Sequence, residues 1–190
     1  DHQTNGKGRY GNGWSALPGK NILMSWVIKP MCAKNKWPSV TIPVAIALKH
    51  GISKLLPQAD IQLKWPNDIL INQKKCVGIL ANAEIKHKYI VIGIGINVNE
   101  PPSADRTSIN NEALHQHDRW AVLDGCLDAL MSAKLAIESA DFKPDDWNQS
   151  AAYFGQNVQV MTNQLMTGIF KGINKKGAII LKTGKGQMEI

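Results

Sequence analysis

The sequence predicts an α+β fold, in which a mixed, largely antiparallel sheet with flanking helices precedes a small β-barrel or sandwich. Two observations favour this class. Three apolar segments between residues 69 and 98 are joined by linkers short enough for antiparallel hairpins. From residue 153 onward, short strands separated by Asn, Gly and Lys recur every ~8–12 residues, as in small all-β units. We therefore expect one larger unit over residues 1–150 and a second over residues 153–190, which is too small for a large core of its own and packs on the first.

The first third of the chain predicts a strand, a helix and a second strand. Residues 21–28 mix apolar and β-favouring side chains and are expected to form a buried strand. Residues 40–56 repeat apolar side chains at helical spacing, so we expect a helix that starts near Pro43 with Ser39 as its N-cap. Residues 59–65 favour a short strand, which ends at the turn sequence Pro-Asn-Asp.

The rest of the chain predicts further strands, a surface loop and two helices. Residues 100–118 are polar and contain proline, which favours a loop. A helix over residues 119–139, capped by Asp118, and a shorter one over residues 145–152 should follow. The expected apolar stripe of the longer helix consists of Trp120, Leu123, Leu127 and Leu130. Strands are expected over residues 69–71, 75–85, 88–98, 157–162, 165–173, 177–183 and 187–190.

The composition indicates anionic ligands or partners and no membrane insertion. The formal charge is +7, and the surplus lies at the two ends, since residues 1–36 carry six Lys or Arg against one acidic residue. No apolar run approaches the ~18 residues that cross a bilayer, and no signal-peptide pattern occurs. The three cysteines have neither disulfide nor zinc-site spacing, which predicts a protein of the reducing cytoplasm.

The loop "GKGRYGNGW", residues 6–14, is the first candidate for a ligand site. Glycines let backbone N–H groups approach a ligand, and Lys7 and Arg9 would share one side of an extended segment. This is a reasonable clamp for a carboxylate or phosphate, although a solvated, mobile basic loop has the same composition. The neighbouring "GWSALPGKN" is not a phosphate loop, because its glycines are one residue too far apart and Asn21 replaces the Ser or Thr.

Two further clusters could carry chemistry. "KWPND" places Lys64 at a strand end, where its charge could reach an anion; a tight turn with a surface lysine is the alternative. "GIGIN", residues 93–97, removes side chains from a strand and ends in Asn97, which offers a donor and an acceptor to a base edge. The alternative is a glycine-kinked core strand. "GIGIN" does not match the dinucleotide-binding fingerprint, because it lacks the third glycine and the strand-to-helix turn.

The sequence contains neither a metal-binding histidine motif nor a G-x-S-x-G nucleophile motif. A basic clamp without a nucleophile suits phosphoryl or acyl transfer driven by positioning and electrostatics.

Together the clusters resemble biotin protein ligases over nearly the whole chain. "QTNGKGRYGNGW" is similar to their Q-x-x-G-R-G-R-x-G-x-x-W segment, and "KWPNDILINQKKCVGIL" to their K-W-P-N-D-L…K-x-x-G-I-L stretch. "VIGIGINVN" resembles their I-G-I-G-I-N-V strand, and "GINKKGAIIL" the G-I-x-x-x-G-x-L-x-L of their C-terminal domain. The resemblance implies a class II synthetase-like catalytic domain followed by an SH3-like domain.

The resemblance also implies a reaction and a site. Biotin and ATP, with Mg²⁺, would give biotinyl-5′-AMP and pyrophosphate, and a lysine of a biotin carboxyl carrier domain would then take the biotinyl group. Lys64 and Arg9 are the expected catalytic residues. Expected biotin contacts come from Gln3, Lys7, Gly8, Arg9, Lys64 and Gly78. Expected ATP or adenylate contacts come from Gly6, Arg9, Tyr10, Gly11, Trp14, Asn67, Asp68 and Asn97. No protein-bound metal site is expected, and a homodimer is compatible with the resemblance.

The sequence departs from the family pattern in three respects. Lys7 stands where the family has arginine and lacks its bidentate fork, which puts that side-chain contact in doubt. Asn82 stands where the family commonly has Glu. The family's Ser-Thr-Asn segment, which contacts biotin, and any winged-helix DNA-binding domain would lie upstream of Asp1, so we expect the sequence to cover only part of the enzyme.

Two other functions are compatible with parts of the sequence. A lipoate- or octanoate-transferring relative would share the broad fold but is not expected to combine "GKGRYGNGW" with "KWPND". A nucleic-acid-binding module would explain the basic ends, but aromatic residues make up only 6% and no stacking motif occurs.

Overall fold

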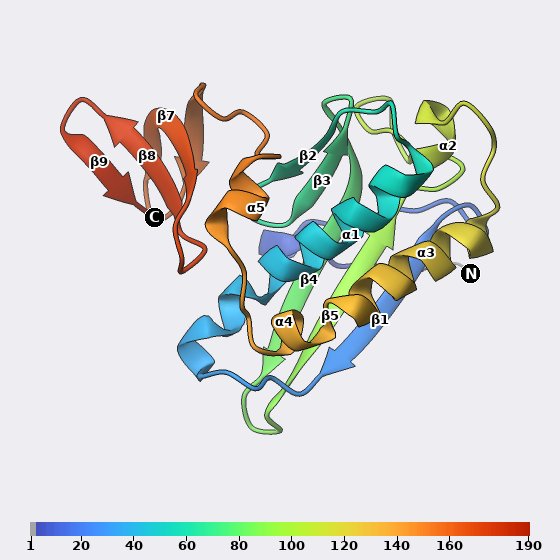
Figure 1. The fold of residues 1–190 in the computed structure, drawn as a ribbon, viewed down its shortest axis with the longest axis horizontal. Coiled ribbons are helices and arrows are strands. Elements are labelled where there is room, and N and C mark those ends of the chain that lie inside the picture. The colour runs from blue at the N-terminus through green and yellow to red at the C-terminus, as the bar shows by residue number, and fades with distance from the viewer. Residues whose placement is uncertain (1–2) are drawn as a thin grey trace.

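A computed structural model describes residues 3–190 and has two antiparallel sheets, as expected for an α+β fold (Figure 1). The larger sheet has the strand order β1-β5-β4-β3-β2. Each adjacent pair is antiparallel, so the two expected hairpins, β3 with β4 and β4 with β5, are confirmed. The strands span β1 Ile22–Ile28, β2 Ile61–Lys64, β3 Asp68–Ile71, β4 Lys74–Glu84 and β5 Tyr89–Ile96.

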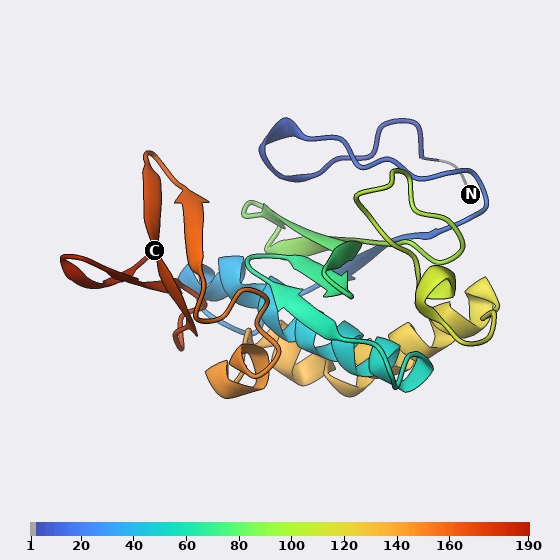
Figure 2. The same ribbon diagram turned by 90° about the horizontal axis from the view of Figure 1, so that it is seen from above.

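Helices cover one face of this sheet, and the N-terminal loop runs over the other (Figure 2). The longest helix, α1, packs on β2, β3 and β4 and against α3. The helices are η1 Arg9–Gly11, η2 Lys34–Val40, α1 Thr41–Leu55, α2 Ile109–Glu112, α3 Arg119–Ser132, α4 Lys134–Glu138 and α5 Pro144–Asn148. No helix in residues 3–190 is long and apolar enough to cross a membrane.

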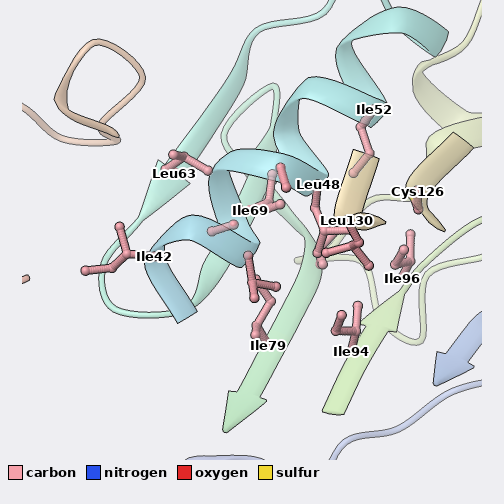
Figure 3. Packing of buried hydrophobic residues seen from close by; sticks show 14 of the residues in the cluster. Ile42, Leu48, Ile52, Leu63, Ile69, Ile79, Ile94, Ile96, Cys126 and Leu130 are labelled. Atoms are coloured by element: carbon pink, nitrogen blue, oxygen red, sulfur yellow. The ribbon is translucent and has the colours of Figure 1, made fainter. Parts of the chain in front are cut away.

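The core lies between the sheet and α1 and α3 (Figure 3). Ile79 of β4 and Ile94 of β5 are paired in register and are 1% and 2% exposed. They face Leu48 of α1 and Leu130 of α3, both buried. Burial of each such side chain contributes roughly 1.5–3 kcal/mol. Because side chains alternate along a strand, this packing leaves the other face of β4 and β5 free to line a site.

The start of α1 differs from the expectation. Residues 34–40 form a 3-10 helix, and α1 follows directly at Thr41, so the chain enters the helix already wound. Ser39 is therefore not the N-cap; its hydroxyl donates to the Lys36 carbonyl oxygen at 2.8 Å. Pro43 lies in the first turn as predicted, where a missing N–H removes no helical hydrogen bond.

The expected cap of α3 is confirmed, and its expected apolar stripe is confirmed in part: Leu130 is buried and Leu123 packs against the core, but Trp120 and Leu127 are exposed. The Asp118 carboxylate accepts hydrogen bonds from the backbone N–H groups of Trp120 and Ala121. Trp120 is 59% exposed, and the buried face of α3 consists of the expected Leu130 together with Val122 and Cys126, which were not expected. Val122, Cys126 and Leu130 follow one another at intervals of four residues, so the helix turns this face, and not Trp120 and Leu127, toward the core. The helix also ends at Ser132, where the single expected helix breaks into α3 and α4.

The C-terminal unit is a four-stranded antiparallel sheet with β6 and β9 at its edges. The SH3-like description stays a prediction. The expected packing on the first unit is confirmed: the Trp65 indole N–H donates to the Gly177 carbonyl oxygen at 3.0 Å. The linker residue Ala151 pairs with Leu63 in parallel and covers the outer edge of β2. The strands are β6 Asn157–Met161, β7 Leu165–Ile173, β8 Ile179–Thr183 and β9 Gly186–Glu189.

Candidate functional site

A cavity of about 530 Å³ lies on the sheet face opposite the helices. The N-terminal loop forms one side of it through Gln3, residues 7–10 and residues 12–14. Strands β1, β3, β4 and β5 form its floor, and Arg106 contributes from the loop after β5. Segments far apart in the sequence thus meet over the middle of the sheet.

Glycines form the centre of the floor. Gly78 of β4 and Gly95 of β5 are paired in register, and the Trp14 ring lies directly on both. A Cβ at either glycine would overlap this ring, so the absence of a side chain is required for the close approach. The loop holds Trp14 there, because its backbone N–H donates to the Gly6 carbonyl oxygen at 2.9 Å.

Cations surround the Trp14 ring. The Lys75 ammonium and the Arg106 guanidinium each lie 5.4 Å from its centroid. Lys75 Nζ also lies 2.6 Å from Asp68 Oδ1, in an ion pair that joins β4 to β3. Arg106 Nη1 and the Trp14 indole nitrogen are buried and have no hydrogen-bond partner among the described residues. The cavity therefore presents positive charge and unused donors to a ligand.

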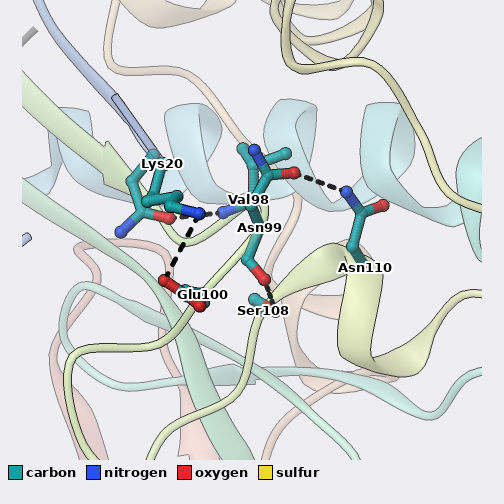
Figure 4. A network of polar contacts seen from close by, with 7 residues as sticks. Lys20, Val98, Asn99, Glu100, Ser108 and Asn110 are labelled. Atoms are coloured by element: carbon teal, nitrogen blue, oxygen red, sulfur yellow. Dashed lines mark hydrogen bonds and ion pairs between the residues drawn. The ribbon is translucent and has the colours of Figure 1, made fainter. Parts of the chain in front are cut away.

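The segment that carries Arg106 is fixed to the sheet. Arg106 and Lys75 form a parallel β-bridge, and the Thr107 N–H donates to the Lys75 carbonyl oxygen at 3.0 Å. The Asn97 side-chain amide donates to the Thr107 carbonyl oxygen, also at 3.0 Å. A polar network around Asn99 ties the two ends of the loop together (Figure 4).

The structure brings most of the expected site residues together. The expected residues that line the cavity are Gln3, Lys7, Gly8, Arg9, Tyr10, Trp14, Asn67, Asp68 and Gly78. Gly6 and Gly11 do not line it, although Gly6 accepts the hydrogen bond from Trp14.

Two further expected residues, Lys64 and Asn97, do not line the cavity either. The Lys64 ammonium lies 5.9 Å from the centroid of the Tyr153 ring, outside the cavity, because Lys64 ends β2 at the side of the C-terminal unit. Asn97 is fully buried, and its side-chain amide donates to the Thr107 carbonyl oxygen rather than pointing a donor into the cavity. Its location fits the alternative, a polar residue at the end of a core strand.

Lys75 and Arg106 line the cavity and were not among the expected site residues. A signal for Lys75 existed, because it is the lysine of the K-x-x-G-I-L stretch, three residues before Gly78. Nothing in the sequence singles out Arg106, which lies in a polar loop and reaches the cavity only through its bridge to Lys75.

A second cavity of about 540 Å³ adjoins the first and shares Arg9, Asn67, Ile79 and Leu80 with it. It extends to Trp65 and to Gly177 of the C-terminal unit. Within residues 3–190, no group of three His, Cys, Asp or Glu side chains could hold a metal ion. The paired cavities are therefore suited to an elongated, anionic ligand held by side chains and backbone.

Comparisons with known proteins show which family the sequence resembles. The sequence matches the family model of the Biotin/lipoate A/B protein ligase family over residues 1–99 and that of the Biotin protein ligase C terminal domain over residues 153–190. It is 34% identical to the Bifunctional ligase/repressor BirA of Bacillus subtilis over 100% of this chain and 62% of the relative.

Two further proteins are similar. The Biotin--[acetyl-CoA-carboxylase] ligase of Mycobacterium tuberculosis is 28% identical over 97% of this chain and 72% of its own length. The structure of the biotin protein ligase from Aquifex aeolicus in complex with biotin and ATP superposes with a TM-score of 0.88 at 25% identity, covering 100% of this chain and 83% of that one.

The chain spans 62% of the length of the Bacillus relative. The matching family model covers residues 1–99, which is more than half of the 190 residues and includes the cavity apart from Arg106. The chain therefore belongs to the Biotin/lipoate A/B protein ligase family.

Proposed function

We propose that the protein is an ATP-dependent biotin protein ligase. Biotin would be activated as biotinyl-5′-AMP and then transferred to a lysine of a biotin carboxyl carrier domain. In the first step a biotin carboxylate oxygen attacks the α-phosphorus, and the bond to the β-phosphate breaks so that pyrophosphate leaves with the electron pair. In the second step the acceptor amine attacks the carbonyl carbon, and AMP leaves. We assign the catalytic part to residues 1–150 and the C-terminal domain to residues 153–190.

The observation that carries the proposal is the cationic cavity over the glycine floor. A carboxylate and a phosphate repel each other, so their approach requires positive charge at the point of reaction. Lys75 provides it, since it lines the cavity and Asp68 orients its ammonium at 2.6 Å. We therefore assign to Lys75 the role expected of Lys64, which does not line the cavity.

The N-terminal loop would close over the activated intermediate. Arg9 lines both cavities, so its guanidinium can follow a ligand that extends from one into the other. Gln3, Gly8 and Lys7 line the same side, where backbone and side-chain donors can meet biotin. Exclusion of water by this loop would protect the mixed anhydride from hydrolysis.

Mg²⁺ would enter with the nucleotide. Among residues 3–190, Asp68 is the one carboxylate that lines the first cavity, and it is already paired with Lys75. The ion would therefore be held largely by phosphate oxygens and water, as is common for Mg²⁺. A cytoplasmic location and a homodimer are also part of the proposal; the three free cysteines support the first, and the outer edge of β1, which pairs with no other described strand, supports the second.

Biotin-dependent exchange of labelled pyrophosphate into ATP tests the activation step. We expect exchange with biotin and none without it. Transfer is tested separately by mass spectrometry of a carrier domain, which should gain one biotinyl group at a single lysine. A protein that exchanges pyrophosphate with neither biotin nor lipoate would contradict the proposal.

The lipoate alternative remains relevant because the matching family includes lipoate ligases. The same exchange assay with lipoate or octanoate in place of biotin distinguishes the two. The match of residues 153–190 to a biotin protein ligase domain favours biotin.

A further inference from the structure

Arg106 has an unused charge inside the cavity. Its guanidinium carbon lies 5.4 Å from the centroid of the Trp14 ring, and its Nη1 is buried without a hydrogen-bond partner among the described residues. A buried donor without a partner costs roughly 1–3 kcal/mol, and a charged one costs more. A protein site that carries this cost is completed when a ligand supplies the acceptor.

Lys75 differs from Arg106 in this respect. The two cations lie at the same distance from Trp14, but the charge of Lys75 is balanced by Asp68 at 2.6 Å. The acid next to Arg106 in sequence, Asp105, is exposed; a hydrogen bond from Ser103 is the main reason why its carboxyl pKa is lowered, and the charge of Arg106 contributes less. Arg106 Nη1 nevertheless has no hydrogen-bond partner among the described residues. Arg106 therefore keeps a free donor toward the cavity.

The backbone holds Arg106 in place before any ligand binds. Its N–H donates to the Ser103 carbonyl oxygen at 3.2 Å, and Thr107 is tied both to Lys75 and to Asn97. The Thr107 hydroxyl in addition donates to the Glu112 carboxylate. Because the backbone of this segment is already ordered, ligand binding at Arg106 costs the ordering of its side chain but not that of the loop.

We propose that Arg106 binds a phosphoryl group of the nucleotide, beside Lys75. The inference rests on the proposed function, which brings a nucleotide triphosphate into this cavity. A guanidinium suits a phosphate because its planar fork can donate two parallel hydrogen bonds, whereas Lys75 acts as a point charge. The pair would share the negative charge of the reacting groups, with Arg106 as a substrate-binding residue.

Calorimetric titration of ATP, adenosine and biotin tests this proposal with wild-type protein and the variants Arg106→Ala and Arg106→Lys. Removal of a hydrogen bond to a charged group weakens binding by about 10-fold or more. We expect this loss for ATP with Arg106→Ala, changes within about 2-fold for adenosine and biotin, and partial recovery with Arg106→Lys, which restores charge but not the fork.

Arg119→Ala is the matched control, because Arg119 also stacks on a tryptophan, at 4.9 Å from the Trp120 ring, and does not line the cavity. Arg119→Ala removes one positive charge and one stacked arginine outside the cavity, so it reports the effect of the lost net charge, and we expect normal ATP binding in this variant. Thermal unfolding of each variant shows whether the fold is retained.

With the Arg106→Ala variant, the proposal would be overturned by an unchanged ATP affinity, by an equal loss of adenosine affinity, which would place Arg106 at the base, or by a loss confined to biotin. Absence of ATP binding by the wild-type protein would overturn it too. The two proposals fail separately. A wild-type protein active in pyrophosphate exchange whose Arg106→Ala variant binds ATP normally refutes only the role of Arg106. ATP binding that depends on Arg106, without biotin-dependent exchange, refutes only the ligase activity.

Discussion

At the scale of single residues, the two lysines Lys64 and Lys75 of the "KWPND…KKCVGIL" stretch lie in different surroundings. Lys75 lies in the cavity and is oriented by Asp68, whereas Lys64 lies over Tyr153 at the junction with the C-terminal unit. The strand order decides this in part, because Lys64 is on the edge strand β2, whereas Lys75 is on β4, in the interior of the sheet. The sequence contains both lysines in suitable motifs, but the side of the sheet that each reaches depends on long-range pairing.

The first prediction compares these lysines. We expect Lys75→Ala to reduce biotin-dependent pyrophosphate exchange by about 100-fold or more, since loss of one group that stabilises transition-state charge typically costs this much. Lys64→Ala should leave the exchange within a few-fold of wild type, because Lys64 does not line either cavity. Equal losses in the two variants, with both proteins folded, would argue against the assignment of Lys75.

The second prediction concerns the glycine floor. Alanine at Gly95 would overlap the Trp14 ring and displace the loop from the sheet. Limited trypsin digestion should then cleave after Lys7 or Arg9 several-fold faster than in wild type, because local opening governs cleavage. Gly125→Ala is the control, since a Cβ there meets no atom within 4 Å. Unchanged digestion in Gly95→Ala would indicate that the loop does not depend on the floor.

At the scale of elements, local signals predicted the start of α3 but not its end or its buried face. The cap at Asp118 depends only on the residues that follow it, so the sequence located the start of α3 correctly. The buried face of α3 depends on which side α1 occupies, and the apolar residues permit two stripes. Trp120 and Leu127, on the expected stripe, are 59% and 40% exposed, whereas Val122 and Cys126 pack into the core.

The third prediction measures the cap of α3. Asp118→Ala removes the acceptor of two backbone N–H groups and should lower the free energy of unfolding by about 1 kcal/mol. Asp124→Ala, on the same helix but away from its end, should change it by less than about 0.5 kcal/mol, because its side chain is exposed. Urea unfolding monitored by circular dichroism gives both values, and a similar loss in both variants would point to a general charge effect instead of capping.

At the scale of the whole molecule, the α+β class and the antiparallel hairpins follow from short linkers and strand spacing, which are local properties. The cavity was less predictable, because it assembles residues from the loop, from four strands of the sheet and from the segment at Arg106. Motifs located most of its wall, since Gln3, Arg9 and Gly78 lie within them. Arg106 reaches the wall through a bridge to Lys75 that no sequence pattern announces.

The fourth prediction concerns the junction of the two units. Trp65→Phe removes the donor to the Gly177 carbonyl oxygen and keeps most of the ring. Because a neutral hydrogen bond contributes about 0.5–1.5 kcal/mol, we expect a drop of this size in the free energy of unfolding. Trp120→Phe, at an exposed position, should have little effect. If the two variants were equally stable, the indole contact would not contribute to the junction.

The last prediction follows from the buried thiols. Burial raises the pKa of Cys126 to about 12 and raises that of Cys76 even more. In the unfolded chain both thiols ionise near pH ~8.5. Above that pH the folded state therefore binds more protons than the unfolded state. The contribution of the two thiols to the free energy of unfolding is fully present below pH ~8.5 and decreases as the pH rises above it.

Each thiol contributes a slope of up to about 1.4 kcal/mol per pH unit between these values. We expect the free energy of unfolding in urea to be nearly constant between pH 7 and 8 and to decrease toward pH 10. Cys76→Ala combined with Cys126→Ala lowers stability at pH 7 through the cavities it creates, but should flatten the decrease above pH 8.5. The slope, rather than the absolute stability, is thus the measurement that isolates the thiols, and an equally steep decrease in the double variant would assign the alkaline loss to other groups.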